Sequence, residues 1–591
     1  MILLLSRIGS ARAVPMEPFA TQGNKLESTC SGGLMTSSAG FRRKLGSAVT
    51  VLAMAVLFLG LSASAQDDIP VLLYQYPNTI NNTTGITSNS LPAQGPDGEF
   101  YDTDWDNGAY NQGSVYTMSL SGDYKLLYSF CAEGGNCRVT GSNPQGGVTL
   151  GTDGNFYGTT TVGGADGNGT VFKITPAGDL NTLHSFAGAY ADGSNPTFPV
   201  IQASNGDFYG VASSGGEYVN GTFFRISGAG SYTTLASFQS SVNGSNPNPP
   251  TQGTDGNFYG TTHNGGPKSA CCGTVYRVTA AGKITVLYTF PSGEGSSVGQ
   301  LVEGSDGNFW GVTNGVPFIS GGELFKVSPS GDFTVVHTFS GTGDACCSSS
   351  GLIAGSDGYL YGISDAGGTA NVGAIYRVDP STDAYAVLYS FCATSPCHAF
   401  GPGPVLAQDT NGTFYGNTVG NSDGGGYFFS FDTGLGPFVR TLTQSGHVGA
   451  TVEFLGQNFT GATKVEFGGV AATFKVVSDS ELTAVVPASA VTGVVKVIAA
   501  AKETLTALSK FKVLPAIKSI TPTSGPVGTV VTVTGTGLTG VSKVTVDGKT
   551  ASFTQVSSTE IKVTVPSNAG TGKIEVTTAG GSVSSATFTV T

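Results

Sequence analysis

Aspartate beside glycine recurs in a short motif along most of the chain. The heptapeptide TDGNFYG begins at residues 152 and 254, and related copies are PDGEFYD at 96, SNGDFYG at 204, SDGNFWG at 305, SDGYLYG at 356 and TNGTFYG at 410. A carboxylate in this setting is typical of a metal-binding loop, of acid catalysis or of a tight turn. Asn205 and Asn411 replace the acid in two copies, which keeps the turn and loses the charge. We therefore interpret the acid as a turn residue. The five copies that have it contain Asp97, Asp153, Asp255, Asp306 and Asp357.

A second set of carboxylates directly follows the first copy of the motif. In YDTDWDNG, Asp102, Asp104 and Asp106 take alternate positions, like the first ligands of an EF-hand calcium loop. Asn107 stands where that loop has glycine, and Gly113 stands where it has the bidentate glutamate. The sequence therefore offers these three aspartates as a calcium site, with a solvated acidic loop as the alternative. No other cofactor is expected.

The histidines do not form a recognisable catalytic set. His184 and His337 take a position that other repeats fill with tyrosine, which predicts a packing role. His263 and His398 lie in variable segments without a visible acid or nucleophile partner, and His447 lies in the C-terminal tail. Neither a Ser/His/Asp set nor a metal-ligand spacing stands out. No catalytic residue is predicted.

Eight cysteines follow the N-terminal leader, an even number in a chain that we expect to be exported. They are Cys131, Cys137, Cys271, Cys272, Cys346, Cys347, Cys392 and Cys397. We predict two local disulfides, Cys131–Cys137 and Cys392–Cys397. The two adjacent pairs either bridge neighbouring repeats or form vicinal disulfides. A soft-metal site is the alternative, and the oxidising conditions of export disfavour it.

Each copy of the motif belongs to a longer unit of four short strands. A second element follows it, from GSVYTM at 113 to GYFFSF at 426, and so does a third, exemplified by LLYSF at 126. Together with the apolar stretch before each DG, these predict strands A, B, C and D. In the second unit the strands are expected at residues 147–150, 155–160, 169–174 and 180–186. The A–B link is Asp-Gly or Asn-Gly, the dipeptide that a two-residue hairpin turn needs.

Units of about fifty residues with four strands are typical of β-propeller blades, and a linear stack is the alternative. The series opens with a lone D strand at 71–76 and ends on a C strand at 426–431. Closure of a ring by the N-terminal strand explains both ends. We therefore predict an all-β fold, with a seven-bladed β-propeller over residues 66–436 and two Ig-like β-sandwich domains after it.

Two families share these patterns. In the order DGNFYGTT, GG, GTVFKI and LYSF, residues 70–432 resemble the GloVer-type tandem repeat of secreted bacterial proteins. That resemblance implies export and no catalytic residue. The DGN-aromatic pattern is also distantly similar to streptogramin lyases, which are seven-bladed and use a histidine pair, an acid and magnesium. We find no counterpart of those site residues in this chain.

The C-terminal tail contains two copies of one module at a constant offset of 79, so that Gly449 matches Gly528 and Glu481 matches Glu560. Alternating Val and Thr with glycine turns predict β-sandwiches. The segments SGHVGATVEFLGQNFTG and SGPVGTVVTVTGTGLTG resemble the IPT/TIG family of immunoglobulin-like domains. The resemblance implies spacer or adhesive units, which we expect at 437–514 and 515–591.

Residues 1–65 form the expected leader. The basic run 42–44 precedes an apolar run at 48–61 that is short for a membrane span, and an ASA cleavage site follows. We expect a secretory signal cleaved after Ala65, with Met35 as the preferred start. The mature chain is then expected to have no transmembrane segment.

Charge separates the repeat region from the tail. Residues 66–436 contain 9 Lys and Arg against 29 Asp and Glu, whereas residues 437–591 contain 12 and 8. Such an acidic region disfavours nucleic acid and anionic lipid as partners.

These patterns predict a secreted or cell-surface bacterial protein that binds an extracellular glycan or protein. The B–C and D–A loops emerge at one end of a four-stranded blade and carry the cysteines and the most variable sequence, so that end is the expected ligand face. The alternative is an extracellular lyase or glycoside-degrading enzyme with its site among the same loops. A purely architectural repeat protein is a third reading. The sequence does not indicate an oligomeric state.

Overall fold

We describe a computed structural model of the chain, which describes residues 70–76, 92–132, 137–267, 272–291, 297–315, 321–346, 351–393, 400–420 and 426–591. These residues belong to one compact unit, Ser64–Thr591. The predicted leader and its cleavage site lie outside the described residues. No helix within the described ranges is long and apolar enough to cross a membrane.

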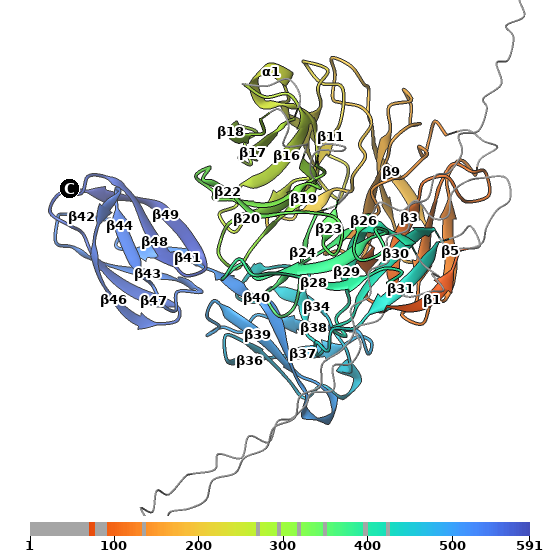
Figure 1. The fold of residues 1–591 in the computed structure, drawn as a ribbon. Helices are drawn as coiled ribbons and strands as arrows, with labels where there is room; N and C mark the ends of the chain where they lie inside the picture. Colours follow the sequence, from red (N-terminus) through yellow and green to blue (C-terminus); the bar gives the residue numbers. More distant parts are fainter. Residues whose placement is uncertain are drawn as a thin grey trace, which may run out of the picture. The chain divides into compact units, whose positions relative to one another are not determined.

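The described part of the repeat region contains seven antiparallel sheets with strands in the order A, B, C and D (Figure 1), besides one two-stranded sheet in the connecting segments. We number them along the chain. Sheet 1 contains β2 (Ala93–Gln94), β3 (Phe100–Asp104), β4 (Ser114–Met118) and β5 (Tyr124–Ser129); sheet 2 contains β6 (Val148–Leu150), β7 (Phe156–Thr160), β8 (Thr170–Ile174) and β9 (Leu180–Ser185). Sheet 3 contains β10 (Ile201–Gln202), β11 (Phe208–Ala212), β12 (Thr222–Ile226) and β13 (Tyr232–Ser237); sheet 4 contains β15 (Thr251–Gln252), β16 (Phe258–Asn264), β17 (Thr274–Val278) and β18 (Ile284–Thr289). The strands expected in the second unit are therefore confirmed to within one residue.

The later sheets follow the same order. Sheet 5 contains β19 (Ser297–Glu303), β20 (Phe309–Thr313), β21 (Glu323–Val327) and β22 (Phe333–Thr338); sheet 6 contains β24 (Ile353–Ala354), β25 (Leu360–Ser364), β27 (Ala374–Val378) and β28 (Tyr385–Ser390). Sheet 7 contains β29 (Phe400–Gln408), β30 (Phe414–Gly420) and β31 (Tyr427–Phe431). The connecting segments add α1 (Ser240–Asn243), β14 (Ser245–Pro247), β23 (Ala345–Cys346) and β26 (Ala366–Gly367).

The repeated motif forms the A–B turn and the B strand. Gly154 has φ +73°, a conformation that glycine adopts without steric penalty. Gly158 lies in strand B, directly after the aromatic pair. A Cβ at this position would lie 2.5 Å from the ring of Phe172. The glycine after the aromatic pair therefore makes room for the C-strand ring of the same sheet.

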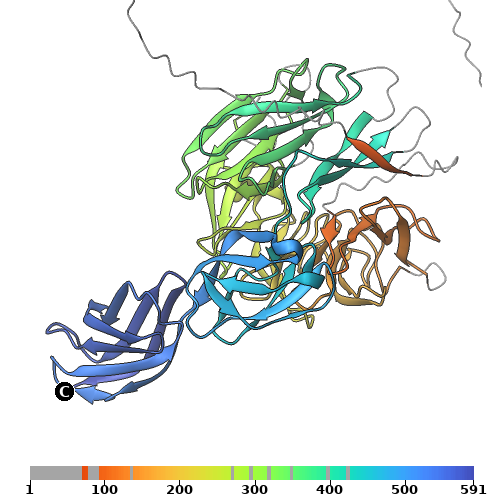
Figure 2. The same cartoon turned by 90° about the horizontal axis from the view of Figure 1, so that it is seen from below.

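The fourth strand of sheet 7 comes from the N-terminal end of the described chain. β1 (Val71–Gln75) pairs antiparallel with β31, and the two strands lie side by side in both views (Figures 1 and 2). The hydroxyl of Tyr76, just after β1, donates a hydrogen bond to Oδ1 of Asn417 in β30 at 2.8 Å. The pairing expected for the lone N-terminal strand is thus present.

The apolar core of the repeat region lies between successive sheets. Tyr101 of sheet 1 stacks on Phe156 of sheet 2 with ring centroids 3.9 Å apart, and similar buried clusters join each later pair of neighbours. One more cluster joins the two ends of the series, where Phe100 of sheet 1 packs against Tyr415 of sheet 7 at 5.1 Å. Buried aromatic area of this kind is the main source of stability in such a fold.

A side-chain oxygen of Gln or Glu also links neighbouring sheets through their A–B turns. Gln202, at the end of strand A in sheet 3, accepts a hydrogen bond from Thr152 N in the turn of sheet 2 at 2.9 Å. The equivalent pairs are Gln252 with Ser204, Glu303 with Thr254, Gln408 with Ser356, and Gln94 with Thr410. The last pair joins sheet 1 to sheet 7. Sheets 2 and 6 have Leu150 and Ala354 at this position, which cannot accept such a bond.

Two β-sandwiches follow the repeats. The first contains β32 (Arg440–Thr441), β34 (Thr451–Leu455), β38 (Glu481–Val485) and β37 (Phe474–Val476) in one sheet, and β33 (Ser445–His447), β40 (Thr504–Leu514), β39 (Gly493–Ile498), β35 (Lys464–Phe467) and β36 (Val470–Ala472) in the other. The second contains β41 (Ala516–Thr521), β43 (Val530–Thr536), β47 (Glu560–Thr564) and β46 (Ser552–Ser557), and opposite them β42 (Ser524–Gly525), β49 (Gly581–Val590), β48 (Gly572–Thr578), β44 (Lys543–Val546) and β45 (Lys549–Thr550). Each sandwich has its own buried core.

The first sandwich contacts A–B turns of the repeat region. Ser480 Oγ donates to the carbonyl of Pro96 at 2.7 Å, and Gln457 Nε2 donates to Thr410 Oγ1 at 3.0 Å. The B–C and D–A loops leave the sheets at the opposite ends of the strands.

Candidate binding site

The repeated aspartate of the motif is engaged within its own turn. Asp153 accepts a hydrogen bond from the backbone N–H of Asn155 at 3.2 Å and another from the hydroxyl of Tyr157 at 2.8 Å. The other aspartates have the same pair of donors, with Trp310 in place of tyrosine at Asp306. Where asparagine replaces the acid, the amide donates to the tyrosine, as Asn205 does to Tyr209 at 3.0 Å. The turn interpretation is confirmed, and the tyrosine four residues later is the partner that the prediction missed.

The three aspartates proposed for calcium lie in β3 and in the loop after it. Asp102 is buried in β3, where it accepts from the hydroxyl of Tyr116 at 3.1 Å. Asp104 is also buried, and it accepts from Nδ2 of Asn107 at 2.7 Å. Asp106 lies in the loop that follows. Within the described ranges no three His, Cys, Asp or Glu side chains are placed to hold a metal ion, and the calcium site stays a prediction.

Burial accounts for the raised pKa of the Asp104 carboxyl. Burial raises the pKa of its carboxyl to about 6, against the lowering effect of the hydrogen bond from Asn107. One carboxyl oxygen, Oδ1, has no hydrogen-bond partner. Sheets 2, 4, 5 and 7 have threonine at the equivalent position.

Two histidines pack as expected and also pair with an acid. His184 stacks on Tyr232 of the next sheet with ring centroids 3.7 Å apart, and its Nε2 lies 2.7 Å from Oδ2 of Asp192. His337 repeats the arrangement with Tyr385, at 4.0 Å, and Asp344, at 2.9 Å. The packing role is confirmed.

The acid partners of these histidines were missed, because they lie seven or eight residues further along, in D–A loops. Asp192 also accepts from the backbone N–H of Ala187 at 2.7 Å, and Asp344 from that of Ser340 at 2.9 Å. Both pairs therefore tie a D–A loop to strand D. Of the remaining histidines, His263 lies in β16 and His447 in β33, and His398 lies outside the described residues.

One predicted disulfide is present in full. Cys131 and Cys137 are bonded, with Cα atoms 4.6 Å apart. Cys272, Cys346 and Cys392 are also disulfide-bonded. Cys271, Cys347 and Cys397 lie outside the described residues, so the Cys392–Cys397 bridge and the pairing of the adjacent cysteines stay predictions.

A repeated D–A loop motif builds the most distinctive surface of the molecule. The tetrapeptide GSNP occurs at 141–144, 193–196 and 244–247, directly before sheets 2, 3 and 4. Its asparagine has positive φ each time, 58° at Asn143, 53° at Asn195 and 56° at Asn246. Each asparagine N–H donates to a B–C loop carbonyl of the preceding sheet, at 2.8 to 3.0 Å. The motif therefore fixes each of these loops against its neighbour.

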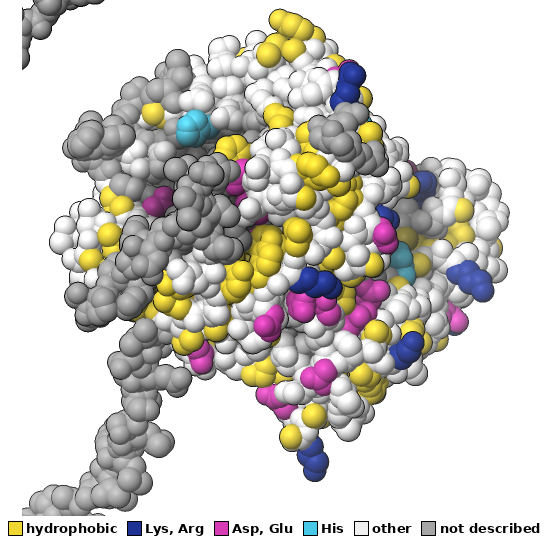
Figure 3. Space-filling model, turned by 90° about the vertical axis from the view of Figure 1, so that its right-hand side faces the viewer, with side chains coloured by type: hydrophobic (Ala, Val, Ile, Leu, Met, Phe, Trp, Pro, Cys, Tyr) yellow, Lys and Arg dark blue, Asp and Glu magenta, His cyan; other side chains and the backbone are white. Residues whose placement is uncertain are grey.

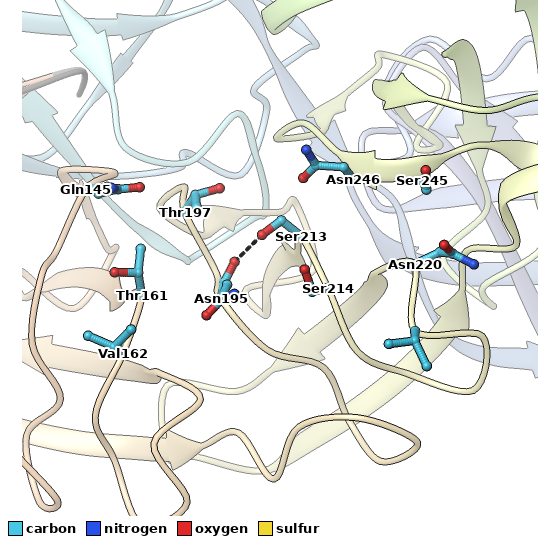
Figure 4. Close-up of a pocket in the computed structure, with 11 residues that line it drawn as sticks. Gln145, Thr161, Val162, Asn195, Thr197, Ser213, Ser214, Asn220, Ser245 and Asn246 are labelled. Atoms are coloured by element: carbon cyan, nitrogen blue, oxygen red, sulfur yellow. Dashed lines mark hydrogen bonds between the residues drawn. The ribbon is translucent and has the colours of Figure 1, made fainter. Parts of the chain in front are cut away.

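Between these loops lies a groove of about 610 Å³, which we call the amide groove (Figure 4). Two of its lining residues are valines, and the others carry a hydroxyl or a carboxamide. The lining residues are Gln145, Thr161, Val162, Asn195, Thr197, Ser213, Ser214, Val219, Asn220, Ser245 and Asn246. All belong to B–C and D–A loops of sheets 2 to 4 or to the short β14, at the end of the sheets where the ligand face was expected. None was named from the sequence, and the GSNP repeat is the signal that would have found them.

Most of the polar side chains in the groove are free to meet a ligand. Thr161 Oγ1 donates to the carbonyl of Asn143 at 2.9 Å, Asn220 Nδ2 to that of Tyr218 at 2.7 Å, and Ser213 Oγ to that of Asn195. The others make no side-chain hydrogen bond within the part of the chain that the structure describes. These are Gln145, Asn195, Thr197, Ser214, Ser245 and Asn246. A cluster of uncharged donors and acceptors without partners is suited to an uncharged polar ligand.

Exposed aromatic side chains lie on two of the loops that line the groove. Tyr190 is 79% exposed and Tyr218 is 42% exposed. Tyr190 and Glu217, with strand D of sheet 3, line a second hollow of about 430 Å³. Large exposed rings near a polar groove are a common feature of binding surfaces.

Family comparisons match both parts of the chain. The model of the Gloeobacter/Verrucomicrobia repeat matches residues 86–314 and 268–465, and that of the IPT/TIG domain matches residues 437–513 and 515–590. No curated protein matches the chain in sequence.

Solved structures show weaker similarity. A streptogramin B lyase aligns with 60% of this chain and 96% of its own at 13% identity, with a TM-score of 0.39. A fungal alcohol oxidase of the AA5 family, in complex with copper, aligns with 88% of this chain and 98% of its own at 11% identity and a TM-score of 0.36. The surface glycan-binding protein PbSGBP-B from Prevotella bryantii aligns with 26% of this chain and 39% of its own at 21% identity and a TM-score of 0.20. At these TM-scores the similarities carry no argument about the site.

Proposed function

Because the chain belongs to the Gloeobacter/Verrucomicrobia repeat family, we propose that it is an exported or cell-surface binding protein built on a closed seven-bladed β-propeller. The amide groove is its ligand site, and the two IPT/TIG domains are spacer or docking units. The predicted leader and the family support export.

Three contacts between the ends of the repeat series support ring closure. β1 completes the sheet of β31, the Phe100 cluster joins sheet 1 to sheet 7, and Gln94 accepts from Thr410 N at 3.3 Å. The last two kinds of contact also join consecutive sheets elsewhere. A linear stack would leave both terminal sheets with an unpaired face, which these contacts argue against.

The observation that carries the binding function is the state of the side chains in the groove. At the A–B turns, polar side chains form hydrogen bonds within the turn or with the neighbouring sheet. In the groove, the amides of Asn195 and Asn246 and the hydroxyls and amides near them have no such partners. Uncharged donors and acceptors on a rigid scaffold match the hydroxyl groups of a carbohydrate or the polar backbone of an extended polypeptide.

The IPT/TIG domains suit a role at the other end of the sheets. The first of them contacts A–B turns through Ser480 and Gln457. A docking or spacer unit placed there leaves the loop end for the ligand.

The enzymatic alternative, a lyase or glycoside-degrading enzyme, lacks comparable support. The residues that line the groove include no carboxylate, histidine or cysteine, and glycoside hydrolysis ordinarily needs two carboxyl groups. Binding without turnover is therefore the favoured function.

The test is direct binding of neutral polysaccharides by the purified chain, with chromatography of the sugars after incubation. The double variant Asn195→Gly/Asn246→Gly removes two groove amides and keeps the positive φ that glycine also tolerates. We expect binding to weaken by about tenfold or more, since each lost hydrogen bond contributes about 0.5 to 1.5 kcal/mol.

The matched control is Asn143→Gly. Asn143 holds the same place in the GSNP motif, but its amide donates to the carbonyl of Trp105 at 3.1 Å and does not line the groove. Binding should stay at the parent level in this variant. Equal losses in the double variant and the control would contradict a ligand site in the groove, and release of shortened sugars would support the enzyme instead.

A further inference from the structure

The same pair of loops contributes residues to the groove and to the hollow beside Tyr190. Asn195 and Tyr190 belong to the D–A loop before sheet 3, and Asn220 and Glu217 belong to the B–C loop of that sheet. The two loops are joined to each other, since Tyr190 N donates to the carbonyl of Gly216 at 3.2 Å.

Resting on the proposed function, we infer that the ligand is a neutral oligosaccharide chain that occupies the amide groove and extends across these loops to Tyr190. The groove supplies hydrogen bonds to sugar hydroxyls, and the exposed ring of Tyr190 supplies a flat apolar surface for the face of a further sugar. Tyr218 lies on the connecting loop, also exposed.

Two separate hollows favour a chain over a single sugar. The groove holds about 610 Å³ and the hollow about 430 Å³, each within or near the size range of small-molecule sites. A monosaccharide would fill only one of them. A chain that reaches both gains the contacts of the second hollow with no further loss of translational freedom.

Charge selects a neutral chain. No charged side chain lines the groove, and the hollow contributes the carboxylate of Glu217. Figure 3 shows acidic side chains together with a few Lys and Arg side chains on one face of the molecule, and residues 66–436 contain 29 acids against 9 bases. Repulsion from this net negative region disfavours uronate or sulfated polysaccharides.

An aromatic side chain next to amides is the expected pair of elements for sugar recognition. Tyr190 presents a large surface with few rotatable bonds, so ordering it on binding costs little entropy. Tyr190 is 79% exposed although its backbone N–H donates a hydrogen bond to the carbonyl of Gly216. A ring this exposed on an anchored loop has no packing role to explain its size.

The test uses isothermal titration of the purified chain with gluco-, xylo- and manno-oligosaccharides, from disaccharide to octasaccharide, and with polygalacturonate as an acidic probe. We expect affinity to rise with chain length and the acidic probe not to bind. Tyr190→Ala should weaken binding of the longer sugars about tenfold and leave that of the shortest sugars unchanged. The control Tyr110→Ala removes another exposed tyrosine, in the B–C loop of sheet 1, that lines neither hollow, and should have no effect.

The outcomes separate the two proposals. Sugar binding that is lost in Asn195→Gly/Asn246→Gly but is independent of chain length and of Tyr190 keeps the groove as ligand site and overturns the extended chain. Preference for polygalacturonate overturns the neutral ligand. Absence of binding to every neutral sugar overturns both this inference and a glycan as the ligand of the groove. If an unglycosylated polypeptide binds there instead, the groove remains the ligand site and the sugar ligand is wrong.

Discussion

The two ends of the sheets in the repeat region use similar polar residues in opposite ways. At the A–B turns, Asp153 meets Tyr157 and Gln202 meets Thr152, so donors and acceptors are matched. At the loop end, Gln145 and Asn195 line a groove with side chains that have no such partners in the described structure. The turns also repeat in all seven units, whereas the groove draws on only three of the sheets. In the turns, which repeat in every unit, hydrogen bonds within the fold satisfy the polar side chains. In the loops that differ between units, polar side chains remain available to a ligand.

The largest expected effect comes from the repeated end. Gly158→Ala places a Cβ where the ring of Phe172 lies, 2.5 Å away, and we expect the free energy of unfolding to fall by about 2 to 3 kcal/mol. Asn195→Gly, at the loop end, should change it by less than about 0.5 kcal/mol. Chemical denaturation followed by tryptophan fluorescence measures both, because both tryptophans of the chain lie in the repeat region. A larger loss in Asn195→Gly would reverse the contrast between the two ends.

A pH experiment compares Asp104 with the threonine that other sheets have at the same position of strand B. Burial raises the pKa of Asp104 to about 6, above the value of about 3.9 expected in the unfolded chain. Its contribution to stability is therefore greatest below about pH 4 and is lost as the pH rises to about 6. Asp104→Thr introduces the residue found at this position in sheets 2, 4, 5 and 7.

At about pH 7.5 the free energy of unfolding of the threonine variant should exceed that of the parent by about 2 kcal/mol. At about pH 4 the two free energies should be close. The same difference at both pH values would show that the carboxyl of Asp104 is not the group that titrates. Asp102 and Asp106 remain in both proteins and serve as the common background.

A smaller effect distinguishes two glutamines. Gln202→Leu removes the acceptor of Thr152 N and should lower the free energy of unfolding by about 1 kcal/mol. Sheet 2 already carries Leu150 at this position, so the variant should still fold. Gln145→Leu, in the groove, should be neutral in stability and should weaken ligand binding. If the stability loss appeared in Gln145→Leu instead, the assignment of paired and free amides would be wrong.

Strand positions and the partner of the N-terminal strand were predictable because they depend on periodic residues. The Asp-Gly turns, the glycine at Gly158 and the lone segment at 71–76 each have one arrangement that suits them. The acid partner of His184 was not predictable in the same way. Asp192 reaches it because the D–A loop folds back on strand D, and loop conformation depends on contacts that no local pattern encodes.

The groove was predictable in part. The GSNP repeat was visible, and asparagine in positive φ is a known preference, so the loops that carry Asn195 and Asn246 were within reach. Which side chains would remain unpaired was not, because Asn143 has the same sequence context and is engaged by Trp105. For Asp102, Asp104 and Asp106 the sequence offers ligand-like spacing and the structure places the first two in a buried strand, and the calcium site stays a prediction.

Hydrogen–deuterium exchange of the purified chain, with and without a neutral octasaccharide that it binds, tests the central claim most directly. The account predicts slower exchange in the loops at 141–146, 193–197, 213–221 and 244–247, and no change at the A–B turns. Protection centred on the turns or on the IPT/TIG domains, with the loops unaffected, would contradict it.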